Sequence, residues 1–260
     1  MGDSTDLREL LDFAVDAAWQ AGKITLEYFQ TPIDIASKAD QSPVTIADKR
    51  GEEKLRELIS SRYPDHAIVG EEYAEKKADG PFRWILDPID GTASFIRGVG
   101  LYGVLMGLER DGQCVLGVAN FPALGELVYA AENIGCYWNG RRARVSKVAE
   151  LKKATLLMTD VSHLYQHGRG PAYERLVSAT AMSRTWGDCY GHILVATGRA
   201  EIMLDPIMNV WDCAPLLPIL REAGGTFTDW TGEATIRGGN ALSTNGALFS
   251  QVMAAIDQRS

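Results

Sequence analysis

The stretch Trp84-Ile-Leu-Asp87-Pro88-Ile-Asp90-Gly91-Thr92 places two carboxylates at the end of an apolar run. The apolar run predicts a buried strand, and the rigid Pro-Ile step fixes the spacing of the two aspartates. Hard divalent cations prefer several oxygen ligands, so this pair can share one ion or bridge two. The Ile89 carbonyl and the Thr92 hydroxyl are further oxygen donors, and the N–H groups of Gly91 and Thr92 can hold an anion. The same residues also fit an ordinary Asp-Pro turn, so the stretch alone leaves both interpretations open.

Two other acidic segments favour the metal interpretation. Glu71 and Glu72 follow the short apolar run that ends at Gly70, and sheets of α/β proteins present their sites at such strand ends. Asp212 follows Trp211 at the start of a predicted helix, where an aspartate also serves as an ordinary N-cap. Taken together, these segments supply four carboxylates from strand ends and a helix start, which suits a magnesium site.

The order of predicted helices and strands along the sequence divides the chain into two halves. The first half, 1–145, predicts a helix from Leu7 to Thr25 with Ser4 and Thr5 as N-cap candidates, and a second helix that opens on a capping box, Thr45 to Asp48. Its short apolar runs predict an antiparallel meander, with an Asn139-Gly140 hairpin before a strand at 143–145. The runs are 67–69, 83–86, 102–108, 114–119 and 127–131.

The second half, 146–260, alternates between strand and helix patterns. Strands are predicted at 155–158, 182–186, 202–204, 226–228 and 241–243, and helices at 173–181, 189–197, 212–223 and from Gly246 onward. Two helices and a meander followed by this alternation predict a layered, mixed α/β protein. We expect the two halves to form one compact unit.

Composition excludes several functional classes. With 46% hydrophobic and 23% charged residues, the chain of 260 residues can bury a large core, which excludes an intrinsically disordered protein. Its net charge of −8 argues against nucleic acid and anionic membranes as partners, because both attract an excess of Lys and Arg. The four cysteines lack C-x-x-C spacing, which favours free thiols in a reducing compartment. The N-terminal sequence resembles neither a signal peptide nor a myristoylation site, so we expect a cytoplasmic protein.

The acidic motifs together resemble a known family. Glu71-Glu72, Asp87-Pro-Ile-Asp90-Gly-Thr92 and Trp211-Asp212, in this order and separation, resemble the inositol monophosphatase family of magnesium-dependent phosphatases. The resemblance covers nearly the whole chain and includes the segments 44–48, 194–198 and 222–225. It implies an αβαβα sandwich of the inositol monophosphatase and fructose-1,6-bisphosphatase type. It also implies a homodimer with two or three Mg²⁺ ions per active site.

The resemblance assigns roles by position. The first metal would lie among Glu71, Asp87, the Ile89 carbonyl and Thr92, and the second among Asp87, Asp90 and Asp212. Glu71 and Asp48 would reach a third, weaker ion through waters. The phosphate would sit on the metals and on the backbone of Gly91 and Thr92. Thr92 and Glu71, with Asp48, would orient the attacking water, so these three are the catalytic candidates.

A separate segment bears on the leaving group. Trp186-Gly187-Asp188, with Arg184 before it and Tyr190 after it, resembles the histidinol-phosphatase branch of the family. An acid at position 188 suits a cationic substrate, because histidinol phosphate carries an ammonium group and an imidazole. Asp188 is equally compatible with a plain N-cap on the following helix. The residues expected to bind the substrate are Gly91, Thr92, Arg184, Gly187, Asp188, Asp205 and Asn209.

The favoured activity is therefore hydrolysis of the small phosphate ester L-histidinol phosphate, a step of histidine biosynthesis. An inositol-1-monophosphatase is the nearest alternative, and a catalytically silent, regulatory member of the family is the alternative from another class. Arg97 stands where the family often has His, and is compatible with a phosphate contact or with a solvated loop. His163 and His167 have zinc-protease spacing without the glutamate base, and we expect them beside a mobile loop at 166–171.

Overall fold

A computed structural model describes residues 7–37 and 43–257 of the chain. The N-cap candidates Ser4 and Thr5 lie outside the described residues. The helices are α1 (Leu7–Tyr28), α2 (Ile46–Arg62), α3 (Thr92–Phe95), α4 (Val161–Gln166), α5 (Gly170–Ala179), α6 (Asp188–Ala196), α7 (Val210–Ala223) and α8 (Phe249–Asp257), with short 3₁₀ turns at Pro122–Leu124 and Leu151–Lys153. The strands are β1 (Ile35–Ser37), β2 (Pro43–Thr45), β3 (Ala67–Gly70), β4 (Phe82–Asp90), β5 (Gly103–Arg110), β6 (Gln113–Phe121), β7 (Glu126–Ala131), β8 (Gly135–Trp138), β9 (Arg141–Arg142), β10 (Thr155–Met158), β11 (Met182–Arg184), β12 (Ile202–Asp205), β13 (Thr226–Thr228) and β14 (Ala241–Thr244).

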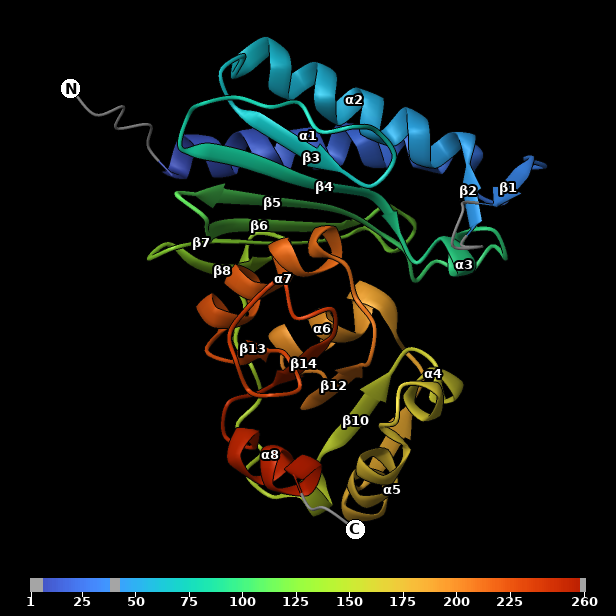
Figure 1. The fold of residues 1–260 in the computed structure, drawn as a ribbon, viewed down its shortest axis with the longest axis vertical. Helices are drawn as coiled ribbons and strands as arrows, with labels where there is room; N and C mark the ends of the chain where they lie inside the picture. Colours follow the sequence, from blue (N-terminus) through green and yellow to red (C-terminus); the bar gives the residue numbers. More distant parts are fainter. Residues whose placement is uncertain (1–6, 38–42, 258–260) are drawn as a thin grey trace.

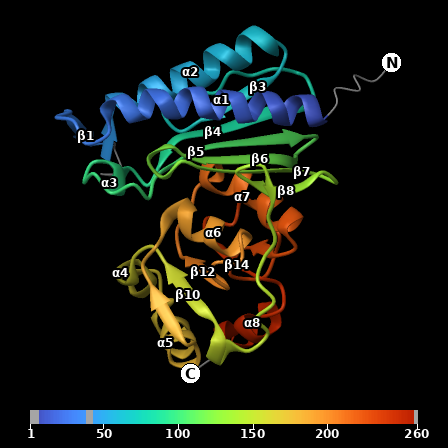
Figure 2. The ribbon, with the colours of Figure 1, turned by 180° about the vertical axis from the view of Figure 1, so that it is seen from behind.

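The chain forms five layers. Helices α1 and α2 cover one face of a seven-stranded sheet, β3 to β9, and helices α6 and α7 lie between this sheet and a five-stranded one (Figure 1). Helices α4, α5 and α8 cover the far face of the second sheet, as the reverse view also shows (Figure 2). The expected αβαβα sandwich is therefore confirmed.

Alternating side chains hold the layers together. In β4, Trp84 and Leu86 pack against the core under α1 and α2, whereas Ile85 packs into the core that contains α7. Likewise in β10, Leu156 and Met158 face one side of the second sheet and Leu157 the other. Because successive strand residues point to opposite faces, both sheets are buried on both sides.

The predicted antiparallel meander is correct for β4 to β7 but wrong for its first pair. Strand β3 runs parallel to β4, because the chain at 71–81 returns to the end at which β3 began. Short apolar runs identify strands without giving their direction, which explains the error. The parallel arrangement places Glu71, just after β3, beside the end of β4 that carries the two aspartates.

Other local predictions need smaller corrections. The Asn139-Gly140 hairpin is confirmed, but its second strand, β9, covers 141–142 rather than 143–145. The expected loop at 166–171 is wrong at both ends, since α4 includes Gln166 and α5 begins at Gly170. No helix among the described residues is long and apolar enough to cross a membrane. The division into halves at residue 145 stays a prediction, and the core between the sheets draws side chains from both halves.

Candidate active site

Three aspartates from distant positions meet between the first sheet and α7. Asp87 and Asp90 lie at the C-terminal end of strand β4, where the pairing with β5 is irregular. Asp212 lies in the first turn of helix α7. One carboxylate oxygen from each lies within 4.8 Å of the other two. Three convergent carboxylate oxygens are a donor set that a hard divalent cation prefers.

A capping box explains how the helix presents Asp212. The N-cap residue of α7 is Asn209, and its backbone N–H donates to Asp212 Oδ2 over 2.7 Å. Asp212 is therefore the third residue of the helix, and its interpretation as the N-cap itself is wrong. The hydrogen bond holds the carboxylate back toward the helix start, on the side of Asp87 and Asp90.

Burial and mutual repulsion make this cluster costly as a set of bare anions. Burial, followed by the charges of Glu71, Asp90 and Asp212, raises the pKa of Asp87 well above its ordinary value. Burial, followed by the Asp212 charge, raises the pKa of Asp90 to about 7. Burial likewise raises the pKa of Asp212 to about 7. The strongest charged neighbours of Asp87 are all carboxylates, so a bound cation would relieve the repulsion.

The raised pKa values predict a pH-dependent stability for the metal-free protein. Asp90 and Asp212 titrate near 7 when folded, against an ordinary 3.8, so the folded state binds more protons between these values. Their stabilising contribution is full below the ordinary pKa and is lost as pH rises through about 7. We expect the melting temperature in EDTA to fall by about 5 °C or more from pH 5 to pH 8. Added Mg²⁺ should reverse most of the loss at pH 8.

Calorimetry at several pH values, with and without Mg²⁺, measures this effect. The control is Asp90→Asn, which removes one titrating carboxylate and should flatten the pH dependence in EDTA. A metal-free protein that is equally stable at pH 5 and pH 8 would contradict the assigned electrostatics.

The three catalytic candidates surround the same turn. Glu71 donates its N–H to the Leu86 carbonyl over 3.3 Å, and its side chain is hydrogen-bonded to Asp87. The Thr92 hydroxyl lies 2.9 Å from the Ile89 carbonyl and 3.2 Å from Asp48 Oδ1. Glu71 is therefore bonded directly to the cluster, whereas Thr92 is bonded to Asp48 and to the backbone of the turn between Asp87 and Thr92.

Asp48 has two roles in the structure. Its Oδ2 accepts the Thr45 N–H over 2.8 Å, which completes the predicted capping box of α2. Its Oδ1 faces the Thr92 hydroxyl from across the turn. Burial raises the pKa of Asp48, although bonds from Thr45 and Thr92 oppose the rise. The helix start thus delivers a buried carboxylate to the site.

Gly91 allows the chain to turn tightly between Asp90, at the end of β4, and Thr92, at the start of α3. Its φ is +83°, in the region that favours glycine. A Cβ atom there would lie 3.0 Å from the Leu101 carbonyl oxygen and 3.1 Å from Asp188 Oδ2. The same values show that the Asp188 carboxylate borders the backbone expected to hold the phosphate.

A second acidic group, formed by Asp188 and Asp205, lies beside the cluster of Asp87, Asp90 and Asp212. The Cys189 N–H donates to Asp90 Oδ2 over 2.6 Å, which ties the start of α6 to the cluster. Burial and the charges of Asp90 and Asp205 raise the pKa of Asp188 well above its ordinary value. Burial raises the pKa of Asp205 to about 7. Gly187 is the N-cap of α6, so the N-cap interpretation of Asp188 is wrong, and its carboxylate faces the site instead.

Three of the basic or amide candidates lie at the surface. Arg184 is exposed on β11 and donates to the Ser183 carbonyl. Arg97 is exposed and donates to the Ala93 carbonyl over 2.9 Å. Asn209 is exposed at the start of α7. Their predicted contacts with substrate stay predictions.

Sequence reasoning missed residues that contact the second acidic group. Thr159 follows β10 and bonds both to the Asp188 backbone and to Asp205. Ser94 bonds to the Asp188 carboxylate, and His163, expected beside a mobile loop, lies near Asp188 and Asp205. For Thr159 a signal existed, because it ends an apolar strand just as Glu71 does.

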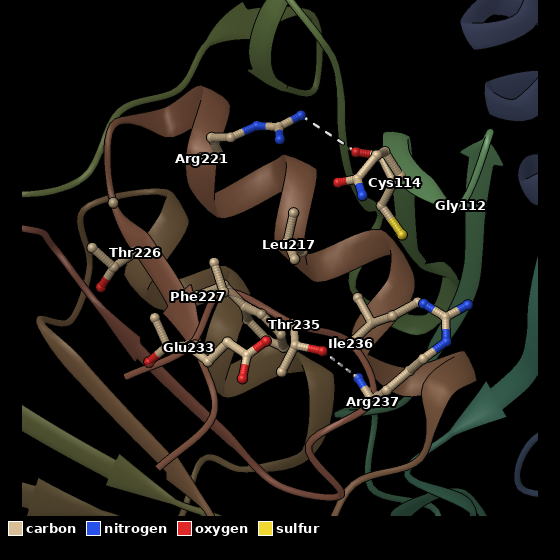
Figure 3. A pocket seen from close by; sticks show the side chains of 14 residues that line it. Gly112, Cys114, Leu217, Arg221, Thr226, Phe227, Glu233, Thr235, Ile236 and Arg237 are labelled. Atoms are coloured by element: carbon tan, nitrogen blue, oxygen red, sulfur yellow. Dashed lines mark hydrogen bonds between the residues drawn. The ribbon is translucent and has the colours of Figure 1, made fainter. Parts of the chain in front are cut away.

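A separate cavity of about 470 Å³ lies on α7 beyond the acidic cluster (Figure 3). Leu217 and Arg221 of α7, Phe227 of β13 and the 233–237 loop line it, and Arg221 donates to the Cys114 carbonyl over 3.3 Å. Asp87, Asp90 and Asp212 do not line this cavity. The candidate active site is therefore the set of convergent carboxylates rather than this cavity.

Comparison with known proteins agrees with this geometry. The model of the inositol monophosphatase family matches residues 6–259. The chain belongs to the inositol monophosphatase family. It is accordingly a phosphoric monoester hydrolase of a metal-dependent family, with an acidic cluster that can hold a metal.

Individual relatives carry different names. A protein called histidinol-phosphatase from Chlorobaculum parvum is 45% identical over 95% of this chain and 96% of its own length. A Rhizobium meliloti protein called inositol-1-monophosphatase is 33% identical over 86% of each chain. Among solved structures, the extragenic suppressor protein SuhB from Bartonella henselae superposes with a TM-score of 0.91, at 25% identity over 97% of this chain and 100% of its own.

Proposed function

We propose that this protein is a magnesium-dependent phosphatase that hydrolyses L-histidinol phosphate to L-histidinol and phosphate. The observation that carries the choice of substrate is the pair of a half-buried Asp188 and a buried Asp205 beside the acidic cluster. An ammonium group and an imidazole can offset these charges, whereas the hydroxyls of inositol cannot. The 45% identity to a protein named histidinol-phosphatase supports the same choice.

The residues of the cluster fit divalent magnesium. Their carboxylate oxygens are hard ligands that converge within 4.8 Å and repel one another. Asp87, Asp90 and Asp212 would hold the ions, with Glu71 and the Ile89 carbonyl completing the environment and two or three ions in each site. Bound magnesium supplies positive charge for the phosphate oxygens and makes a nearby water more acidic.

The protein's own groups would bind and orient the reactants. The N–H groups of Gly91 and Thr92 would hold phosphate oxygens, at a turn that only glycine can form without strain. The Thr92 hydroxyl, hydrogen-bonded toward Asp48, and the Glu71 carboxylate would orient the water in line with the leaving oxygen. Asp188 and Asp205 would bind the cationic leaving group, with Gly187 allowing the close approach of α6.

A parallel assay of the purified protein tests the proposal. We expect phosphate release from L-histidinol phosphate with Mg²⁺, complete loss in EDTA, and recovery when Mg²⁺ is restored. We expect a kcat/KM at least about tenfold lower with inositol 1-phosphate, the loss of one good ionic contact. A preference for inositol 1-phosphate would establish the alternative activity. Absence of turnover with either ester would favour a silent member of the family, although Glu71, Asp87, Asp90, Thr92 and Asp212 are all present.

Further expectations belong to the same proposal. The reaction would place the protein in histidine biosynthesis in the cytoplasm, and the family resemblance supports a homodimer. Light scattering of the purified protein measures its oligomeric state directly. Neither nucleic acid nor a membrane is expected as a partner, given the net charge of −8.

A further inference from the structure

Thr159 stands between the two carboxylates of the second acidic group. Its Oγ1 accepts the backbone N–H of Asp188 over 2.8 Å. Hydrogen bonds from both its side chain and its backbone reach the carboxylate of Asp205 and lower the pKa of that group against the effect of burial. Thr159, directly after β10, thus contacts the first residue of α6 and the last residue of β12.

The Thr159 hydroxyl can bond to both aspartates. A threonine hydroxyl has one hydrogen to donate and can accept others. Because Oγ1 accepts from the Asp188 N–H, its own hydrogen remains available for Asp205, whose pKa the Thr159 side chain lowers. A single group therefore links the backbone of one aspartate to the carboxylate of the other, and removing it leaves a donor and an acceptor without this partner.

The backbone at Asp188 needs such a link. Its φ is +50°, in the left-handed region that glycine adopts most readily and that Asp and Asn adopt more easily than most other residues. The preceding residue, Gly187, packs so closely on Thr159 that a Cβ atom would lie 2.2 Å from the Thr159 Cα. The hydrogen bond from Asp188 to Thr159 holds this strained start of α6 in place.

Asp205 is fixed from another direction as well. His192 Nε2 lies 3.2 Å from Asp205 Oδ2, and His192 Nδ1 lies 2.7 Å from the Ser243 hydroxyl. Burial lowers the pKa of His192 to about 3, so this imidazole is neutral and acts as a hydrogen-bonding support. Asp205 thus has a buried anchor of its own, whereas Thr159 relates its position to that of Asp188.

We propose that Thr159 is a positioning residue that sets the relative placement of Asp188 and Asp205, and thereby the selectivity of the enzyme for a cationic leaving group. The inference rests on the proposed function of this site. Thr159 itself would touch neither the phosphate nor the metals. Its loss should therefore affect recognition of the leaving group more than the chemistry at phosphorus.

The test compares Thr159→Val, which keeps the shape and removes the hydroxyl, with Thr159→Ser, which keeps the hydroxyl. We expect Thr159→Val to lower kcat/KM for L-histidinol phosphate by about tenfold or more, chiefly through KM. The loss with phenyl phosphate, whose leaving group carries no cation, should be several-fold smaller. Thr159→Ser should recover most of the activity toward L-histidinol phosphate.

Calorimetric binding of L-histidinol, the dephosphorylated product, gives a readout independent of turnover. We expect its Kd to rise in Thr159→Val and to return toward the wild-type value in Thr159→Ser. Equal losses with both esters, equal losses in both variants, or unchanged histidinol binding in Thr159→Val would each overturn the role of Thr159. Failure of the proposed function is distinguishable, because the wild-type protein would then neither bind histidinol nor hydrolyse its phosphate.

Discussion

Replacing Asp212 by asparagine is expected to lower phosphate release by about a thousandfold or more, the equivalent of about 4 kcal/mol of transition-state stabilisation. The substitution removes a charged oxygen ligand from a set of three that converge within 4.8 Å. Steady-state kinetics on L-histidinol phosphate at saturating Mg²⁺ measure the loss. Raising the Mg²⁺ concentration should recover only part of it, because the ligand geometry is incomplete.

The fold should survive this change. An asparagine at position 212 retains a side-chain oxygen that can accept the Asn209 N–H, so the start of α7 keeps its cap. Circular dichroism and the melting temperature check this expectation. Asp111→Asn is a matched control in an exposed turn with a φ of +51°, where asparagine is favourable, and it should leave the rate unchanged. An undiminished rate in Asp212→Asn would refute the metal assignment.

Asp188→Asn should separate the two candidate substrates. We expect kcat/KM for L-histidinol phosphate to fall by about a hundredfold, because a buried charge pair with the substrate is broken. Inositol 1-phosphate offers hydroxyls rather than a cation, and its kcat/KM should fall by less than about tenfold. Parallel kinetics on the two esters give the ratio directly.

The asparagine variant also controls for the backbone. Asparagine tolerates the left-handed conformation at position 188 as well as aspartate does, so α6 should start unchanged. Asp188→Ala adds a comparison that removes the hydrogen-bonding side chain as well as the charge. Equal losses on both substrates in Asp188→Asn would show that the residue does not recognise the cation.

Much of the first acidic cluster follows from local sequence. The spacing of Asp87 and Asp90 around Pro88 sets their separation whatever the rest of the fold does, and the capping-box pattern at Thr45 and Asp48 identifies a helix start. Both patterns depend on residues within four positions of each other. Their convergence with Asp212 required the family resemblance, because no local pattern relates residues so far apart.

The remaining features depend on which strands become neighbours. The apolar run before Glu71 predicts a strand, but its parallel pairing with β4 is decided by tertiary packing. Thr159 and His192 gain their roles only because β10 and α6 pack against β12. At Asp188, an N-cap and a site residue have the same sequence pattern, and only the position of Gly187 as the cap distinguishes them.

Some of the acidic residues that give the chain its net charge of −8 lie together in two groups. Asp87, Asp90 and Asp212 form one group, in which Asp87 is buried and the other two are half-buried, and Asp188 and Asp205 form another beside it. Burial raises the pKa values of both groups, and in the proposed function the two groups would bind cations of two kinds. The first group would hold the metal ions that bind the phosphate, and the second group would bind the leaving group.

Anomalous diffraction from crystals grown with Mn²⁺ and phosphate tests the central claim most directly. Mn²⁺ also prefers oxygen ligands and serves as a visible substitute for Mg²⁺. We expect anomalous peaks between the carboxylates of Asp87, Asp90 and Asp212, with phosphate oxygens facing the N–H groups of Gly91 and Thr92. Well-occupied Mn²⁺ sites elsewhere, with these three carboxylates bare, would contradict it.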